Sequence, residues 1–186
     1  MNVADKIKSL IKILVGLNLL IVVLGLFLLN STWNEVLRYS AILNILSLGM
    51  FFLINNYLWK MKYIKGLFGS IPNISGEWKG IIVNKKDGIE QESKLVITQT
   101  WLNVKVETKV ERGNSSTISS EIINTNDTWE LYFVWKATFD GSSFDGTTIV
   151  RIENENELDG LYYTNANFNK NGCTTGTFKA QKITNS

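Results

Sequence analysis

The stretch KLVITQTWLNVKVETKV, residues 94–110, decides how the C-terminal part of the chain is interpreted. Its apolar and polar residues alternate, which is the pattern of a β-strand with one buried face. The phase changes midway, because Leu95 and Ile97 are apolar at odd positions whereas from Val104 onward the apolar positions are even. Side chains of a strand alternate strictly between faces, so a phase change requires a bulge or a turn. We therefore predict two strands joined by a tight hairpin near Thr100.

From Ile74 onward the chain consists of short alternating segments bounded by Gly, Asn, Asp and Ser. The predicted strands cover residues 76–84, 90–99, 102–111, 117–124, 128–138, 146–153, 156–165 and 174–183. The turn signals between them are KKDG, RGNSS, NTND, FDGSSFDG, NEN and NKNG. Eight short strands with hairpin-length connections predict a compact, lipocalin-like, up-and-down antiparallel β-barrel. A two-sheet sandwich shares these signals and stays open as the alternative.

Two long apolar runs precede the barrel, at residues 11–29 and 39–59. A helix needs about 20 apolar residues to cross a bilayer, so both runs are long enough to span. The first run lacks an Ala-x-Ala-like cleavage site and is followed at once by the second, which argues against a signal peptide. We predict a membrane helical hairpin within residues 1–70 and a barrel domain in residues 71–186.

The basic residues around these runs predict the orientation. Lysines precede the first span and follow the second, whereas the connecting loop NSTWNEVLR offers only Arg38. The positive-inside rule then places both termini and the barrel in the cytoplasm. Asn18 and Asn44 lie within the spans, where they could hydrogen-bond between helices and favour assembly. Each could equally bond its own backbone.

The composition argues against an enzyme. The chain contains no histidine and a single cysteine, Cys173. This removes the commonest general base, the Ser-His and Cys-His pairs and any recognisable zinc cluster, so we expect no catalytic residue, metal or cofactor. The first 70 residues carry a net charge of +5 and the remainder −3. A barrel of negative net charge is a poor binder of polymeric nucleic acid, although one small anionic ligand remains possible.

Alternation also predicts which side chains face the barrel interior. In TWELYFVWKATF the inward set is Trp129, Leu131, Phe133, Trp135 and Ala137, and in ELDGLYYTN it is Leu158, Gly160, Tyr162 and Thr164. SGEWKG resembles the first strand of lipocalin-like barrels, in which the tryptophan closes one end. We therefore expect Trp78 to be a plug.

Together these segments resemble a known family. ISGEWKG, ITQTW, FDGTTIVRI and LDGLYYTN…GCTTGTF follow the membrane hairpin in that order. The whole chain resembles the two-transmembrane, β-barrel effectors of CBASS anti-phage systems, the CD-NTase-associated proteins. The resemblance implies a bacterial inner-membrane protein whose barrel binds a cyclic dinucleotide made by a partner CD-NTase-type cyclase. It further implies that binding drives homo-oligomerisation, disruption of the lipid bilayer and abortive infection.

A bound nucleotide needs flat surfaces for its bases and hydrogen-bonding groups for their edges. The candidate platforms are Phe133, Trp135 and Tyr162, and the candidate edge readers are Gln99, Thr164 and Asn165. Trp101 stands with Gln99 at a barrel end that is either the ligand's mouth or the closed floor. Arg151 is the natural phosphate partner, but alternation turns it outward, so Thr108 with backbone amides is the substitute. The same aromatic residues could serve only as barrel core.

Two other functions fit the same organisation. A membrane-tethered, lipocalin-like carrier of a lipid or small hydrophobic molecule would have a uniformly apolar pocket. A barrel that only docks another protein would have a filled interior and an exposed aromatic patch.

Overall fold

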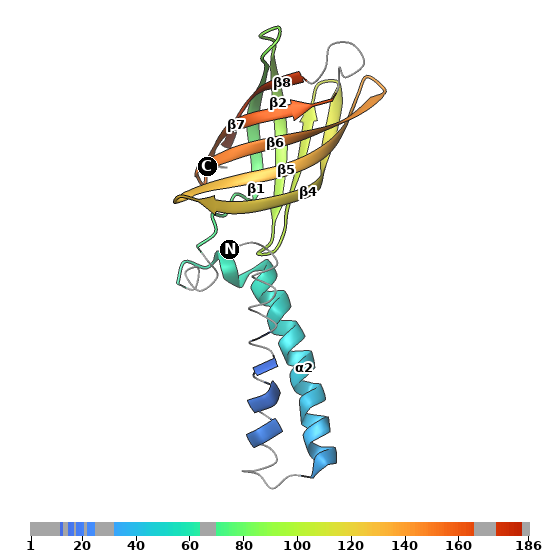
Figure 1. Cartoon of the computed structure of the whole chain (residues 1–186), viewed down its shortest axis with the longest axis vertical. Coiled ribbons are helices and arrows are strands. Elements are labelled where there is room, and N and C mark those ends of the chain that lie inside the picture. The colour runs from blue at the N-terminus through green and yellow to red at the C-terminus, as the bar shows by residue number, and fades with distance from the viewer. Residues whose placement is uncertain are drawn as a thin grey trace. The chain divides into compact units, whose positions relative to one another are not determined.

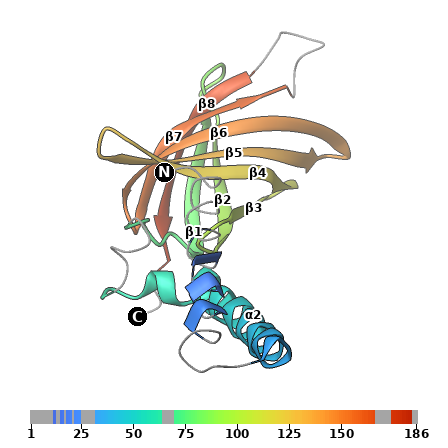
Figure 2. The same cartoon turned by 60° about the horizontal axis from the view of Figure 1, so that its bottom comes forward.

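The C-terminal part of the chain is a closed antiparallel barrel of eight strands in which each strand pairs with its neighbours in sequence and β1 pairs with β8 (Figures 1 and 2). The computed structural model describes residues 12, 15–16, 18–20, 22–24, 32–63, 70–165 and 174–183. The chain divides into two units, Met1–Gly66 and Leu67–Ser186. The closed order of the strands confirms the predicted up-and-down barrel and rules out the two-sheet sandwich.

The strand bounds follow the predicted ones closely at the start of the barrel and less closely in the middle. The strands are β1 (Gly76–Asn84), β2 (Glu90–Gln99), β3 (Val104–Val110), β4 (Gly113–Thr125), β5 (Thr128–Phe139), β6 (Ser142–Asn154), β7 (Glu157–Thr164) and β8 (Thr174–Lys182). The predicted hairpin near Thr100 is confirmed: the Thr100 N–H donates to the Asn103 carbonyl at 2.8 Å, between β2 and β3. The phase change in residues 94–110 is therefore a turn between two strands.

Two predicted turns are wrong, because the chain turns in fewer residues than the polar signals indicated. RGNSS and FDGSSFDG were expected to be loops, but Asn114–Ser116 pair with β3 and Ser142–Phe144 pair with β5. In the second case Asp140 (φ 47°) and Gly141 (φ 76°) make the whole turn. Positive φ at both central residues is the geometry of the two-residue type I′ hairpin, which Asp-Gly favours. Ser142 and Ser143, which follow this turn, are the first residues of β6.

Alternation predicted the inward faces correctly. Leu131, Phe133, Val150 and Leu158 are buried inside the barrel. They belong to the apolar core of the barrel.

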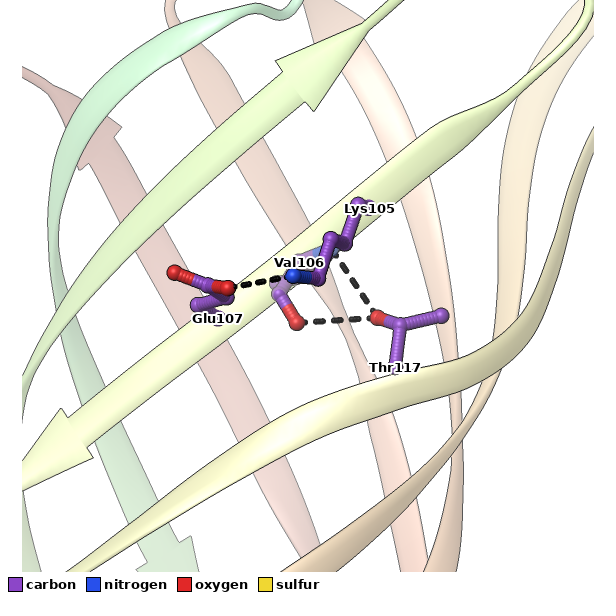
Figure 3. Close-up of polar contacts among 4 residues, drawn as sticks. All are labelled: Lys105, Val106, Glu107 and Thr117. Carbon is purple, nitrogen blue, oxygen red and sulfur yellow. Dashed lines mark hydrogen bonds and ion pairs between the residues drawn. The ribbon is translucent and has the colours of Figure 1, made fainter.

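The pairing of β3 with β4 ends next to a bulge in the pairing of β4 with β5. Regular pairing covers Glu107–Val110 of β3, and the register of β4 against β5 shifts between Thr117 and Ser119. Beyond this point the Thr117 hydroxyl accepts from the Val106 N–H at 2.9 Å and donates to the Val106 carbonyl at 2.9 Å (Figure 3). On the outer face Lys105 pairs with Glu107 at 2.6 Å. A side chain thus replaces backbone partners where β4 bends away from β3.

One end of the barrel, here called the plugged end, is closed by residues 71–74 and by Trp78, Gln99 and Trp101. The side chains of Ile71, Ile74, Trp78 and Trp101 are at most 6% exposed. The Trp78 indole N–H donates to the Ile74 carbonyl at 3.0 Å. This burial agrees with the expectation that Trp78 is a plug, and it shows what the indole closes against.

The N-terminal unit contains helix α2, Trp33–Asn56, followed by a 3₁₀ turn, η1, at Leu58–Lys60 (Figure 1). The predicted connecting loop is wrong at its C-terminal side, because α2 already begins at Trp33. Its start is stabilised by Glu35, whose carboxylate accepts from the Thr32 N–H at 2.8 Å and from the Thr32 hydroxyl at 3.0 Å. Thr-x-x-Glu is the sequence signature of such a start.

Within α2, Arg38–Asn56 is long and apolar enough to cross a membrane, with a mean hydropathy of 1.3 over 19 residues. It is the one such helix among the described residues. The predicted first span, residues 11–29, lies partly outside them, and its described residues, 12, 15–16, 18–20 and 22–24, are helical. Asn44 is exposed on α2, and Asn18 is partly exposed.

Candidate functional site

The barrel contains a cavity of about 250 Å³ at the end opposite the plugged end, here called the cavity end. All eight strands contribute to its lining. The lining residues are Ile82, Asn84, Gln91, Thr108, Val110, Gly113, Asn114, Ser115, Phe133, Trp135, Ala137, Thr138, Phe139, Phe144, Thr148, Tyr162, Thr164, Thr174 and Phe178. The cavity combines aromatic surfaces with hydroxyl and amide groups, which is the composition of a ligand site.

The aromatic side chain of Trp135 is held by contacts with β6. Its indole N–H donates to the Thr148 hydroxyl at 2.8 Å. Phe144 meets the indole edge to face, with ring centroids 6.2 Å apart and an interplanar angle of 77°. Gly146 pairs with Trp135 across β5 and β6. The ring is therefore held by three residues of β6, namely Phe144, Gly146 and Thr148. A ring fixed in this way offers a preformed surface for stacking.

Two glycines let large rings lie against the barrel wall. A β-carbon on Gly146 would lie 2.2 Å from the Trp135 ring, and one on Gly176 would lie 2.3 Å from the Tyr162 ring. No side chain can occupy such a position, so each ring rests on the backbone of the adjacent strand. Both rings line the cavity.

Tyr162 carries a hydroxyl at the border of the cavity. Burial raises the pKa of Tyr162 above its ordinary value, and the negative charge of Asp87 raises it further. The phenol is therefore neutral at physiological pH and can donate a hydrogen bond. This hydroxyl has no hydrogen-bond partner in the part of the chain that the structure describes.

Five of the predicted ligand residues line the cavity together: Thr108, Phe133, Trp135, Tyr162 and Thr164. Phe133 is 5% exposed, and the Thr164 hydroxyl donates to the Asp145 carbonyl at 3.0 Å. They come from β3, β5 and β7, strands far apart in sequence that closure of the barrel brings together.

Gln99 and Trp101 lie apart from this group, at the plugged end. The Gln99 amide donates to the Pro72 carbonyl at 2.9 Å and accepts from the Ile74 N–H at 2.8 Å. Both functions of the side chain are therefore satisfied by the plug. The sequence left open whether this end is the ligand's mouth or the closed floor of the barrel, and the structure shows it closed.

Arg151 and Asn165 also lie outside the cavity lining. Arg151 points outward, as alternation predicted, and pairs with Glu153 at 3.6 Å. The Asn165 side chain accepts from the Asp145 N–H at 2.8 Å, while its own N–H donates to the Asp145 carbonyl at 3.1 Å. Asn165 thus ends the pairing of β6 with β7 at the edge of the cavity.

Several cavity residues were missed by the sequence interpretation. Phe144 and Ser115 lay in segments expected to be turns, so their inward direction was not considered. Gln91 could have been found, because it shares the alternation phase of Leu95 and Ile97 on β2. A polar residue among the inward-facing positions of a strand indicates a possible site, because a buried polar group requires a hydrogen-bond partner.

Comparison with known proteins assigns this barrel to a family. Residues 69–182 match the family model described as Cap15, cyclic dinucleotide receptor domain. The chain belongs to this Cap15 family. The match confirms the resemblance to CBASS-associated effectors that the sequence motifs indicated.

The family relationship extends beyond the barrel. CD-NTase-associated protein 15 of Staphylococcus schleiferi is 28% identical to this Cap15 chain, over 96% of the chain and 98% of the relative. Among solved structures, a redesigned β-barrel aligns with 60% of the chain and 92% of its own length, at 9% identity and a TM-score of 0.44. At that TM-score the likeness is too weak to argue from.

Proposed function

We propose that this Cap15-family protein is a membrane-anchored effector of bacterial anti-phage defence whose barrel binds a cyclic dinucleotide. The observation that carries the proposal is the cavity. It lies inside a domain that matches a cyclic dinucleotide receptor family and is bordered by Trp135, Tyr162 and Phe133. Aromatic faces stack with nucleobases at about 1–3 kcal/mol per base, and hydroxyl and amide groups read their edges. The role is binding, with the ligand supplied by a CD-NTase-type cyclase.

The membrane part of the proposal rests on α2 and on the sequence of residues 11–29. Apolar side chains of α2 are widely exposed, among them Ile45 at 70%, Leu48 at 67% and Phe52 at 60%. An exposed apolar surface of this kind requires lipid or protein partners. We propose a two-span protein of the inner membrane, with both termini and the barrel in the cytoplasm.

Ligand binding would trigger homo-oligomerisation and disruption of the membrane. A ligand shifts such an equilibrium only through different affinities for the two states, so the assembling form must bind it more tightly. Asn18 and Asn44 are the side chains proposed to bond between helices in the assembly, because polar groups in lipid seek partners in neighbouring helices.

The carrier of a lipid or small hydrophobic molecule is less well supported. Such a carrier would have a uniformly apolar pocket, whereas Gln91, Thr108, Ser115 and Tyr162 bring polar groups to this cavity. Those groups would lose their water without gaining partners from a hydrocarbon ligand.

Calorimetric titration of the full-length protein in lipid nanodiscs, against a panel of cyclic di- and trinucleotides, tests the binding step. We expect a cyclic dinucleotide to bind with a Kd below about 100 μM, near −5.5 kcal/mol. Trp135→Ala should lower that affinity, whereas Trp129→Ala, outside the cavity lining, is the matched control. If the wild-type protein binds no member of the panel, the proposed function is wrong.

Co-expression with a cyclase tests the membrane step separately. Cells that contain both proteins should admit a membrane-impermeant dye, and those with the Trp135→Ala variant should not. Ligand binding without permeabilisation would leave the receptor role intact and contradict the effector role.

A further inference from the structure

The two sides of the cavity differ in chemistry. Trp135 and Phe144 lie on β5 and β6, whereas Gln91, Thr108 and Ser115 lie on β2, β3 and β4. In the closed order of strands β4 adjoins β5, with β3 and β2 beyond it, and Ser115 pairs with Ala137, two residues from Trp135. A flat ligand group stacked on Trp135 directs its edges along the barrel wall, and one of those edges can face the polar side.

On the aromatic side, the Trp135 ring is fixed in one orientation. Trp135 is held by the Thr148 hydroxyl, by Phe144 and by the bare backbone of Gly146. Stacking on a preorganised ring loses little conformational entropy on binding. A nucleobase is the part of a cyclic dinucleotide that such a surface accepts.

The polar side offers groups that the protein itself leaves unpaired. The side chains of Gln91, Thr108 and Ser115 have no hydrogen-bond partner in the part of the chain that the structure describes. An amide both donates and accepts, and each hydroxyl does the same, so together they can match the donor and acceptor pattern of a base edge. These groups gain partners when a base displaces the water next to them.

Charge and size argue against recognition through the phosphates. Among the described residues that line the cavity, none is charged. At the cavity end Arg112 already pairs with Asp140 at 3.6 Å, and both side chains are more than half exposed. The cavity of about 250 Å³ is also smaller than the roughly 300–1,000 Å³ of pockets that enclose a drug-sized ligand. It therefore holds part of a cyclic dinucleotide, and the part that suits its chemistry is a base.

We infer that the cavity recognises its ligand through one nucleobase, which stacks on Trp135 and is read by Gln91, Thr108 and Ser115, and that the phosphates are not held by ion pairs. This inference rests on the proposed function of the cavity and deepens it. It assigns the specificity of the receptor to the β2–β4 side and predicts discrimination between bases.

Removal of the amide tests the reading of the base. Gln91→Leu should weaken binding of the cyclic dinucleotide by about fivefold to tenfold, the usual effect of one lost hydrogen bond. It should also reduce the preference among ligands that differ in one base. Gln181→Leu, on the exposed face of β8, is the matched control and should bind as the wild type does. Unchanged affinity and base preference in Gln91→Leu would overturn the inference.

Removal of the ligand's charge tests the role of the phosphates. The full-length protein in nanodiscs is titrated with the preferred cyclic dinucleotide and with its uncharged analogue, in which methyl phosphonates replace both phosphodiesters. We expect the two affinities to agree within about tenfold and to change little between 50 and 300 mM salt, because ion pairs are what salt screens. A larger loss for the uncharged analogue means that charge is read and contradicts the inference.

The controls separate the two levels of the proposal. Binding of the charged ligand but not of the uncharged analogue contradicts base-centred recognition and leaves the receptor role standing. Absence of binding by every cyclic nucleotide to the wild-type protein overturns the receptor role and this inference with it.

Discussion

The two ends of the barrel are built from the same strands and differ in how their polar groups are satisfied. At the plugged end the Gln99 side-chain amide donates to the Pro72 carbonyl and accepts from the Ile74 N–H. The Trp78 indole N–H donates to the Ile74 carbonyl. At the cavity end Gln91, on the same face of the same strand, has no partner in the described part of the chain. Paired buried groups stabilise a fold, whereas unpaired ones are available to a ligand.

This difference predicts unequal losses of stability for two tryptophans, and the larger loss is expected at Trp78. Trp78→Ala should lower the free energy of unfolding by about 3–5 kcal/mol, because it empties a fully buried site. Trp135→Ala should destabilise less, since its ring borders a cavity that already exists, and should abolish stacking with the ligand. Urea denaturation and calorimetry of both variants measure the two effects. Equal losses of stability would contradict the distinction between the ends.

Gln99 and Gln91, both on β2, allow the same comparison of the two ends, with a smaller expected loss of stability. Gln99→Leu leaves the Pro72 carbonyl and the Ile74 N–H unpaired, at a combined cost of about 1–3 kcal/mol. Gln91→Leu should change the free energy of unfolding by less than about 0.5 kcal/mol, because no protein hydrogen bond is lost. Thermal denaturation of the two variants in the same membrane mimetic compares them. A destabilised Gln91→Leu would mean that the cavity end is held by bonds absent from this account.

Ser93 lies between the two ends on the inward face of β2. Its hydroxyl is buried, with 2% of the residue exposed, and has no hydrogen-bond partner among the described residues. Ser93→Ala should raise the free energy of unfolding by about 1 kcal/mol, because an unsatisfied buried hydroxyl is removed. Ser116→Ala, on the exposed face of β4, is the control for the loss of a serine. A decrease in stability would show that the Ser93 hydroxyl does have a partner.

The smallest effect concerns the pH dependence of stability. The folded-state pKa of Tyr162 lies above its ordinary value near 10, because of burial and the charge of Asp87. Its contribution is therefore complete below about pH 10 and is lost as pH rises through the folded-state pKa. Between pH 9 and 11 the melting temperature of the wild type should fall more than that of Tyr162→Phe. Parallel curves would mean that Tyr162 is not desolvated.

Much of the fold followed from alternation. The inward phase of β5 and the turn after Gln99 were predictable because a strand has a strict period of two. The two-residue turn at Asp140 and Gly141 was not recognised, since the serines next to it resemble a longer loop. Phe144 was therefore assigned to a loop, and its edge-to-face contact with Trp135 was not predicted.

The site was predictable only in part, for a related reason. Alternation reports which face a residue occupies but not the end of the barrel that it reaches, so Gln99 and Trp135 looked alike. The end is decided by the plug of residues 71–74, whose position depends on tertiary contacts with Gln99 and Trp78. Hydrogen bonds of that kind leave no periodic trace in the sequence.

Photo-crosslinking of the full-length protein with an azide-bearing cyclic dinucleotide, followed by mass spectrometry, tests the central claim most directly. The label should appear on β5 or β7, within Thr128–Phe139 or Glu157–Thr164, and unlabelled ligand should compete for it. A label confined to residues 70–75, to the turn at residues 100–103 or to α2 would contradict the assignment of the ligand to the cavity end.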